Sequence, residues 1–153
     1  MTKLAFPPDW FKDSLVEKKI YYFTSTTINS DKPHHYICVK RRDDNVLIMS
    51  LCTSKFDTVK KFVESRGLPN ETLVYVRPEP LNEDIPFDKE TYVNCNNVHT
   101  FSVDELVERY TNGSVSLSGE IPDSYYHQIV TGLLASPLIA EEIKSELPSP
   151  DSI

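Results

Sequence analysis

Two apolar runs joined by a short charged connection constrain the fold of this chain most strongly. The first, HHYICVKR, spans residues 34–41, and the second, NVLIMSLCT, spans residues 45–53. The polar RDD between them predicts a β-hairpin. Because both runs are apolar at successive positions, we expect their strands to be buried on both faces. An antiparallel pair of this length brings residues 32–35 and 53–54 to the same rim of a sheet.

The remaining segments predict more strands with helices between them. Strands are expected at 19–28, 71–78, 91–101 and 114–118, and helices at 8–18, 54–69, 102–110, 123–136 and from residue 137 onward. Ser54 and Ser102 stand where N-caps are expected, and Ser136 is predicted to cap the last helix. This order favours the α+β class, with a small, mostly antiparallel barrel or curled sheet and inserted and C-terminal helices.

Length and composition predict one globular domain. The chain has 153 residues, of which 39% are hydrophobic and 25% charged. We expect a single domain over 1–147 with a helical N-terminal extension over 1–19, and a disordered tail at 148–153. No apolar run approaches the roughly 20 residues that span a bilayer, and no signal peptide is expected. Three widely spaced cysteines predict small buried hydrophobic residues in a reducing cytoplasm.

Charge is unevenly distributed along the chain. A net charge of −7 argues against a broad electrostatic grip on nucleic acid. Eight basic residues nevertheless fall within one third of the chain: Lys32, Lys40, Arg41, Arg42, Lys55, Lys60, Lys61 and Arg66. This cluster fits either a local basic groove or an ordinary solvated face of mixed charge.

The two ends of the predicted hairpin carry the candidate chemistry. His34 and His35 are adjacent on a strand, so their side chains point to opposite faces, and we predict no metal site. A single imidazole acting as acid or base is compatible with the pattern, as is one half-buried and one solvated histidine. At the other end, Cys52, Thr53 and Ser54 lack the glycine-flanked turn of an activated nucleophile. Thr53 instead stands beside a helix start, where N–H groups are available to a phosphate.

A third polar stretch, NCNNVH at 94–99, has three asparagines in four residues. Asparagine is depleted in strands because its side chain competes for backbone hydrogen bonds. The stretch fits a bulge with satisfied amides or a polar groove that reads base edges, and the sequence does not separate the two.

Taken in order, KPHHYICV, VLIMSLCTS, NNVHTFSVDEL and LSGEIPDSYYHQIVTGLLAS resemble the PemK/MazF-like family, the toxin ribonucleases of type II toxin–antitoxin systems. The resemblance covers about residues 20–138. It implies a compact SH3-like barrel that forms a homodimer, binds single-stranded RNA in a groove and pairs with a cognate antitoxin. The implied reaction needs neither metal nor cofactor: the ribose 2′-hydroxyl attacks the adjacent phosphate.

The resemblance also implies site residues. Lys32 matches the family's catalytic arginine before proline, and Thr53, followed by Ser54, matches its strand-end threonine. His34 or His35 is expected to act as acid or base beside them. RNA contacts are expected at Arg41, Asn97 and His99. Lysine in place of arginine loses the bidentate fork that suits a phosphate.

Two other interpretations are compatible with the sequence. One is a catalytically inactive member of the same fold, acting as a protein-interaction or accessory module. The other is a structural or viral accessory protein with an unrelated α+β fold. The enzyme interpretation requires residues 32–35 to converge with Thr53, because catalysis needs these groups to meet, and an unrelated fold would leave the histidines scattered.

Overall fold

The computed structural model describes residues 7–25 and 32–153. Its strands are β1 (Lys19–Phe23), β2 (His34–Arg41), β3 (Val46–Thr53), β4 (Leu73–Val76), β5 (Thr91–Asn94), β6 (His99–Ser102) and β7 (Val115–Glu120). Its α-helices are α1 (Pro8–Ser14), α2 (Phe56–Ser65), α3 (Val103–Thr111), α4 (Asp123–Ala135) and α5 (Glu141–Lys144), with 3₁₀ turns η1 (Asn70–Thr72) and η2 (Pro150–Ser152). The predicted loop at 29–33 and the end of the strand predicted at 19–28 lie partly outside the described residues.

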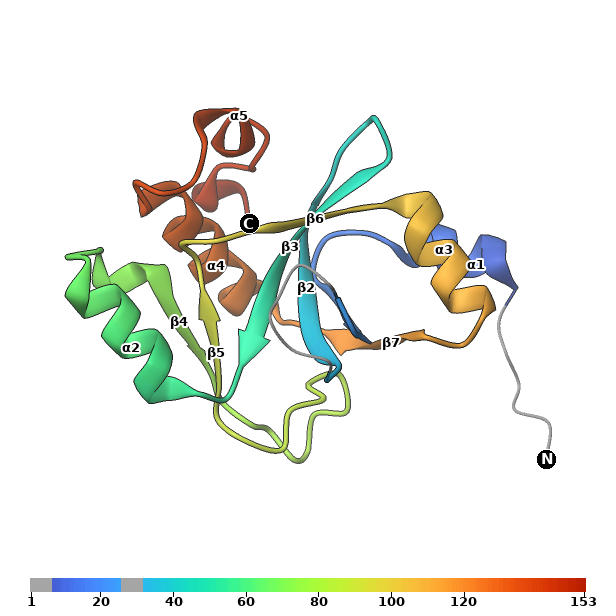
Figure 1. Ribbon diagram of the computed structural model, residues 1–153, viewed down its shortest axis with the longest axis horizontal. Helices are drawn as coiled ribbons and strands as arrows, with labels where there is room; N and C mark the ends of the chain where they lie inside the picture. The colour runs from blue at the N-terminus through green and yellow to red at the C-terminus, as the bar shows by residue number, and fades with distance from the viewer. Residues whose placement is uncertain (1–6, 26–31) are drawn as a thin grey trace.

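The strands form one antiparallel sheet in the order β4-β5-β3-β2-β1-β7 (Figure 1). Strand β3 is central: it pairs with β2 on one edge, and on the other it pairs first with β6 and then, at Cys52 and Thr53, with β5. The predicted α+β class with a mostly antiparallel sheet is confirmed. Within the described part of the chain the strand path is open, because β4 and β7 are its two ends rather than partners.

The predicted hairpin is confirmed and is buried on both faces. Ile37 and Val39 point into one hydrophobic core, which α4 covers. Tyr36 and Cys38 alternate with them and enter a second core, built with residues of α1 and α3. This two-sided burial explains why the two runs are apolar at successive positions.

Of the N-caps predicted at Ser102 and Ser54, the first is confirmed and the second is wrong. Ser102 Oγ accepts a hydrogen bond from Glu105 N at 3.0 Å, as the sequence predicts for α3. Ser54 makes no such bond, because α2 begins at Phe56 with Lys55 at its N-cap. Thr53 Oγ1 accepts from Lys55 N at 3.1 Å instead, so a threonine turn one residue earlier replaces the predicted serine cap.

The C-terminal segment differs from its prediction. The last helix begins at Glu141 rather than at residue 137, and Ser136 is buried with its Oγ donating to Asn96 Oδ1 at 2.6 Å. The tail predicted to be disordered contains η2, and its last residue, Ile153, packs against the α4 core together with Leu147. Partial burial of these two apolar side chains favours this packed arrangement of the segment. None of the helices in the described residues is long and apolar enough to cross a membrane.

Candidate active site

A groove with a volume of about 400 Å³ is lined by residues from the end of β3, the start of β2 and the 77–90 connection. In Figure 1 these three segments lie in the lower part of the view. Its lining residues come from four separate segments: Tyr22; Lys32, Pro33, His34 and His35; Cys52, Thr53, Ser54 and Lys55; and Pro86, Phe87, Asp88, Lys89 and Thr91. The groove therefore depends on the tertiary fold and not on one stretch of sequence.

All five residues predicted to carry catalysis line this groove: Lys32, His34, His35, Thr53 and Ser54. The hairpin register explains the convergence. Tyr36 pairs with Leu51 and Ile37 with Ser50, so the residues before Tyr36 lie across from those after Leu51. The structure thus brings the two ends of the hairpin together at one rim.

His35 sits in an aromatic cleft at the groove wall. Its ring centroid lies 4.5 Å from that of Tyr22 and 5.2 Å from that of Phe87, and Tyr22 is its register partner on β1. Burial lowers the pKa of His35 below its usual range, partly opposed by the nearby Asp88 carboxylate and reinforced by His34. The imidazole is consequently neutral at pH 7, the form that can accept a proton.

His34 is oriented by a backbone contact. Its Nδ1 lies 2.9 Å from the carbonyl oxygen of Lys32, which can only accept, so Nδ1 donates in this hydrogen bond. In the neutral ring this leaves Nε2 as the acceptor, and in the charged ring Nε2 becomes a donor. One nitrogen of His34 is therefore committed to the loop while the other remains available for proton transfer.

Thr53 retains a donor for the groove. Its Oγ1 accepts from Lys55 N, which fixes the side chain at the end of β3. A hydroxyl that accepts one hydrogen bond still has its own hydrogen to donate, and a phosphate oxygen is a suitable acceptor. Thr53 can therefore position a phosphate without itself being a nucleophile.

The charge of the groove is opposite in sign to that of the whole chain. Lys32, Lys55 and Lys89 line it, and Asp88 is the one acidic residue in the lining. The chain as a whole carries a net charge of −7. The basic cluster was predicted to be either a local basic groove or a solvated face of mixed charge. Lys32 and Lys55 belong to a basic groove, together with Lys89 from the acidic 77–90 connection.

The cysteines do not contribute a nucleophile. Cys38, Cys52 and Cys95 are free and buried, as predicted. Burial raises the pKa of the Cys95 thiol to about 12 and that of Cys52 further, so both stay protonated at neutral pH. In residues 7–25 and 32–153, no three His, Cys, Asp or Glu side chains are grouped in a way that would hold a metal ion.

The residues predicted to contact RNA lie outside the groove. Arg41 Nη1 donates to the carbonyl oxygens of Lys12 at 2.8 Å and Leu15 at 3.1 Å, where α1 ends. His99 is 7% exposed, and its ring packs edge-on against Tyr36. Asn97 is exposed in the turn between β5 and β6. The structure does not bring these three side chains to the hairpin ends, and their contact with RNA stays a prediction.

The asparagine-rich stretch contains a buried network. Asn96 Nδ2 donates to Thr72 Oγ1 and to Asn94 Oδ1, both at 2.9 Å, and Asn96 Oδ1 accepts from Ser136 Oγ. The predicted strand over 91–101 is split here into β5 and β6. For Asn94 and Asn96 the satisfied-amide interpretation therefore holds.

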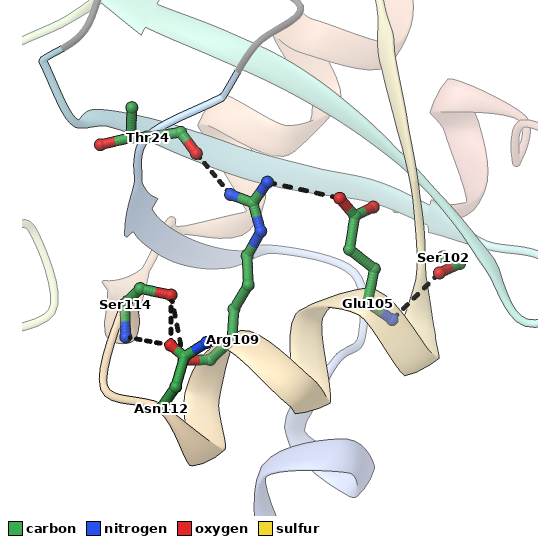
Figure 2. Close-up of polar contacts among 6 residues, drawn as sticks. All are labelled: Thr24, Ser102, Glu105, Arg109, Asn112 and Ser114. Carbon is green, nitrogen blue, oxygen red and sulfur yellow. Dashed lines mark hydrogen bonds and ion pairs between the residues drawn. The ribbon is translucent and has the colours of Figure 1, made fainter.

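A cluster on α3 fixes the strand that carries Tyr22 (Figure 2). Arg109 Nη1 donates to the Thr24 carbonyl oxygen and Nη2 to Glu105 Oε1, and the guanidinium lies 5.6 Å from the ring centroid of Phe23. These contacts hold the end of β1 against α3. Tyr22, which lines the groove, lies on the same strand.

Sequence reasoning missed the opposite wall of the groove, formed by Pro86–Lys89, and the aromatic partner Tyr22. The 77–90 connection reads only as an acidic, proline-interrupted loop. Nothing in its composition indicates that it folds back to His35. Tyr22 carried a weak signal, because three of the five residues of KIYYF are aromatic and the strand pairs next to the hairpin, with Tyr22 opposite His35.

The fold and site define an α+β protein with an open, mostly antiparallel sheet and a lysine- and histidine-lined groove at its edge. The sequence matches no family model, and no curated protein matches it. Among solved structures it is similar to an endoribonuclease in complex with its cognate antitoxin from Mycobacterial species, with a TM-score of 0.49 and 16% identity, over 88% of this chain and 98% of that chain. A likeness of this size identifies neither a family nor an activity.

Proposed function

We propose that this protein is a metal-independent endoribonuclease that cleaves single-stranded RNA, the toxin of a PemK/MazF-like toxin–antitoxin pair. The observation that carries the proposal is the convergence of Lys32, His35 and Thr53 in one cationic groove of an acidic chain. Cation, imidazole and hydroxyl are the groups that transesterification of RNA requires.

In the proposed reaction, neutral His35 removes the proton from a ribose 2′-hydroxyl, whose oxygen attacks the adjacent phosphorus. The bond from phosphorus to the 5′ oxygen breaks, and that oxygen takes a proton from His34. The products are a 2′,3′-cyclic phosphate and a free 5′-hydroxyl. Lys32 and the Thr53 hydroxyl stabilise the charge that develops on the non-bridging oxygens. Acid–base catalysis of this kind contributes about 10²–10⁴ in rate.

The partners of the proposed toxin are single-stranded RNA, a cognate antitoxin protein and a second copy of the chain. RNA is favoured over DNA because the mechanism consumes a 2′-hydroxyl. Tyr22 supports an unpaired substrate: it lines the groove and is 39% exposed, so its ring can stack on a splayed base.

A second candidate function is binding without catalysis. Lys32 stands where the family has arginine, and a lysine offers a point charge in place of a bidentate fork. A groove with that change can hold a phosphate or carboxylate without stabilising a transition state. The protein would then act as an interaction or accessory module.

Cleavage of a mixed single-stranded RNA in excess EDTA tests the proposal. We expect wild-type protein to cleave at the same rate with and without EDTA, and Thr53→Ala and His35→Ala to lose about 10²-fold or more. Thr111→Ala and His127→Ala are matched controls, because both side chains are exposed and lie outside the groove lining. Folded wild-type protein that leaves the RNA intact would favour the binding module.

A further inference from the structure

Beside the groove, β4, β5 and the start of α2 together carry a ladder of three aromatic rings. Tyr75 and Tyr92 are register partners on β4 and β5, with ring centroids 5.3 Å apart at an interplanar angle of 26°. The ring centroid of Phe56, the first residue of α2, lies 4.8 Å from that of Tyr92. Tyr75 is 38% and Phe56 37% exposed, while Tyr92 between them is 8% exposed. The ladder therefore has two open ends and a buried middle.

The ladder is continuous with the groove. Thr53 is the register partner of Tyr92, which in turn pairs with Tyr75. Register partners share a face of the sheet, so Thr53, Tyr92 and Tyr75 form one row that spans two strand spacings, about 10 Å. Lys55, which lines the groove, directly precedes Phe56. A single-stranded nucleic acid with one phosphate at Thr53 therefore has these rings beside its next nucleotide.

The rings are held in place before any ligand binds. The hydroxyls of Tyr75 and Tyr92 donate to the two oxygens of Glu90, at 3.2 Å and 3.3 Å. This carboxylate anchors the hydroxyl edges and leaves the exposed ring surfaces of Tyr75 and Phe56 uncommitted to it. Because the rings are ordered in advance, little side-chain entropy is lost when a base stacks on them.

A small hollow adjoins the open end at Phe56. It has a volume of about 220 Å³ and is lined by Phe56, Lys60, Val63, Glu64, Asn70 and Leu73. Lys60 Nζ lies 5.6 Å from the centroid of the Phe56 ring. An aromatic wall, an amide and an ammonium group match the parts of a nucleotide: a base face, a base edge and a phosphate.

We propose that the Phe56–Tyr92–Tyr75 ladder is a base-stacking subsite for the nucleotides that flank the phosphate in the groove. This inference rests on the proposed function for the presence of RNA, and it adds where the neighbouring bases lie. Stacking on an aromatic platform tolerates any base, so the subsite extends the RNA footprint without dictating its sequence.

The test uses a nine-nucleotide oligodeoxynucleotide, which lacks the 2′-hydroxyl and cannot be cleaved, and the same backbone with abasic sites. Affinities are measured by fluorescence anisotropy for wild-type protein, Tyr75→Ala and Phe56→Ala. We expect each alanine variant to bind the normal oligonucleotide about tenfold or more weakly. Tyr75→Phe and Phe56→Tyr restore most of the affinity, and Leu138→Ala, at an exposed apolar residue outside both sites, leaves it unchanged.

The abasic oligonucleotide identifies the interaction. With no base to stack, its affinity is the same for wild-type protein and for Tyr75→Ala, whereas a role of the rings in folding alone would weaken both oligonucleotides equally. Equal binding of the normal oligonucleotide by wild type and both alanine variants would overturn the subsite. If wild-type protein shows base-dependent binding here yet cleaves no RNA, the enzyme proposal fails and the subsite stands.

Discussion

His35 is the residue whose environment most affects the proposed chemistry, since its ring lies between Tyr22 and Phe87 in a half-buried cleft. Burial lowers its pKa from the usual 6.5, so the folded protein keeps a neutral imidazole below the pH at which a free histidine is half protonated. We expect single-turnover RNA cleavage to persist as the pH falls through 6.5 and to decline only at lower pH. A cleavage rate that is already lost by pH 6.5 would contradict a neutral base at this position.

Asn96 is the residue on which the packing between β5, η1 and α4 depends. Replacing it with alanine removes one buried hydrogen bond from each of Thr72, Asn94 and Ser136. Each lost bond costs about 0.5–1.5 kcal/mol, and we expect Asn96→Ala to lower the free energy of unfolding by about 3 kcal/mol. Urea denaturation measures this. Asn97→Ala, at the exposed neighbouring position, serves as the control, and equal midpoints for the two variants would refute the buried network.

The meeting of residues 32–35 with residues 53–54 could be predicted from the sequence, because a hairpin brings its two open ends together whatever surrounds it. The environments of Arg41 and His99 could not. Arg41 is bound by Lys12 and Leu15, and His99 is covered by Tyr36, which are all distant in sequence. The local sequence shows that Arg41 and His99 are polar, but it does not show whether their side chains contact a ligand or another part of the protein.

Among the elements, the 77–90 connection supplies the groove wall that no pattern predicted, and Gly119 on β7 permits its approach. Glu120 N donates to the Asp84 carbonyl oxygen at 3.0 Å. A Cβ at position 119 would overlap that same carbonyl group and lie 3.3 Å from Pro86 Cδ. Asp84 and Pro86, at the start of this wall, are therefore packed directly against Gly119.

We expect Gly119→Ala to displace this segment and weaken binding of a single-stranded oligonucleotide by about tenfold, since the variant moves Phe87 and Lys89 away from the hairpin ends. Anisotropy titration measures the affinity, and circular dichroism checks that the sheet is retained. Ser118→Ala, at the preceding strand position, is the control. Wild-type affinity in a folded Gly119→Ala protein would mean that the 84–89 wall does not contact the ligand.

Elements with a strong internal pattern were predictable, and elements that depend on docking were not. The β2–β3 hairpin follows from two apolar runs and a polar connection. The last seven residues, 147–153, carry two large apolar side chains, Leu147 and Ile153, in a polar stretch, and both pack against the α4 core. The start of α2 differs from its prediction. Thr53 Oγ1 accepts a hydrogen bond from Lys55 N, and the helix begins at Phe56 without a cap from Ser54.

At the scale of the whole molecule, a chain with a net charge of −7 carries a groove lined by three lysines, and this contrast predicts how binding responds to salt. For single strands, the logarithm of the affinity falls with log salt by about 0.7 for each phosphate neutralised. Lys32, Lys55 and Lys89 line the groove, so we expect a slope of about −2. Lys55→Ala and Lys89→Ala each reduce its magnitude by about 0.7, whereas Lys61→Ala, exposed on α2 outside the groove, does not. A slope near zero would exclude phosphate binding there.

The α+β class was predictable from the alternation of strand and helix patterns, but the outline of the sheet was not. Strand β3 changes partner from β6 to β5 along one edge, and this exchange is set by the short turn after Asn94 and its buried amide network. As a result β4 and β7 remain at opposite ends of the strand path in the described residues. No local propensity encodes that choice.

The central claim is that the hairpin ends cut RNA through its own 2′-hydroxyl, and the ends of the products test it most directly. A defined single-stranded RNA is incubated with the protein in EDTA beside a copy with one 2′-deoxy substitution at the cleaved step. We expect a 2′,3′-cyclic phosphate and a 5′-hydroxyl from the first, and no cut at the substituted step of the second. A 5′-phosphate product, or cleavage that ignores the missing hydroxyl, would contradict the account.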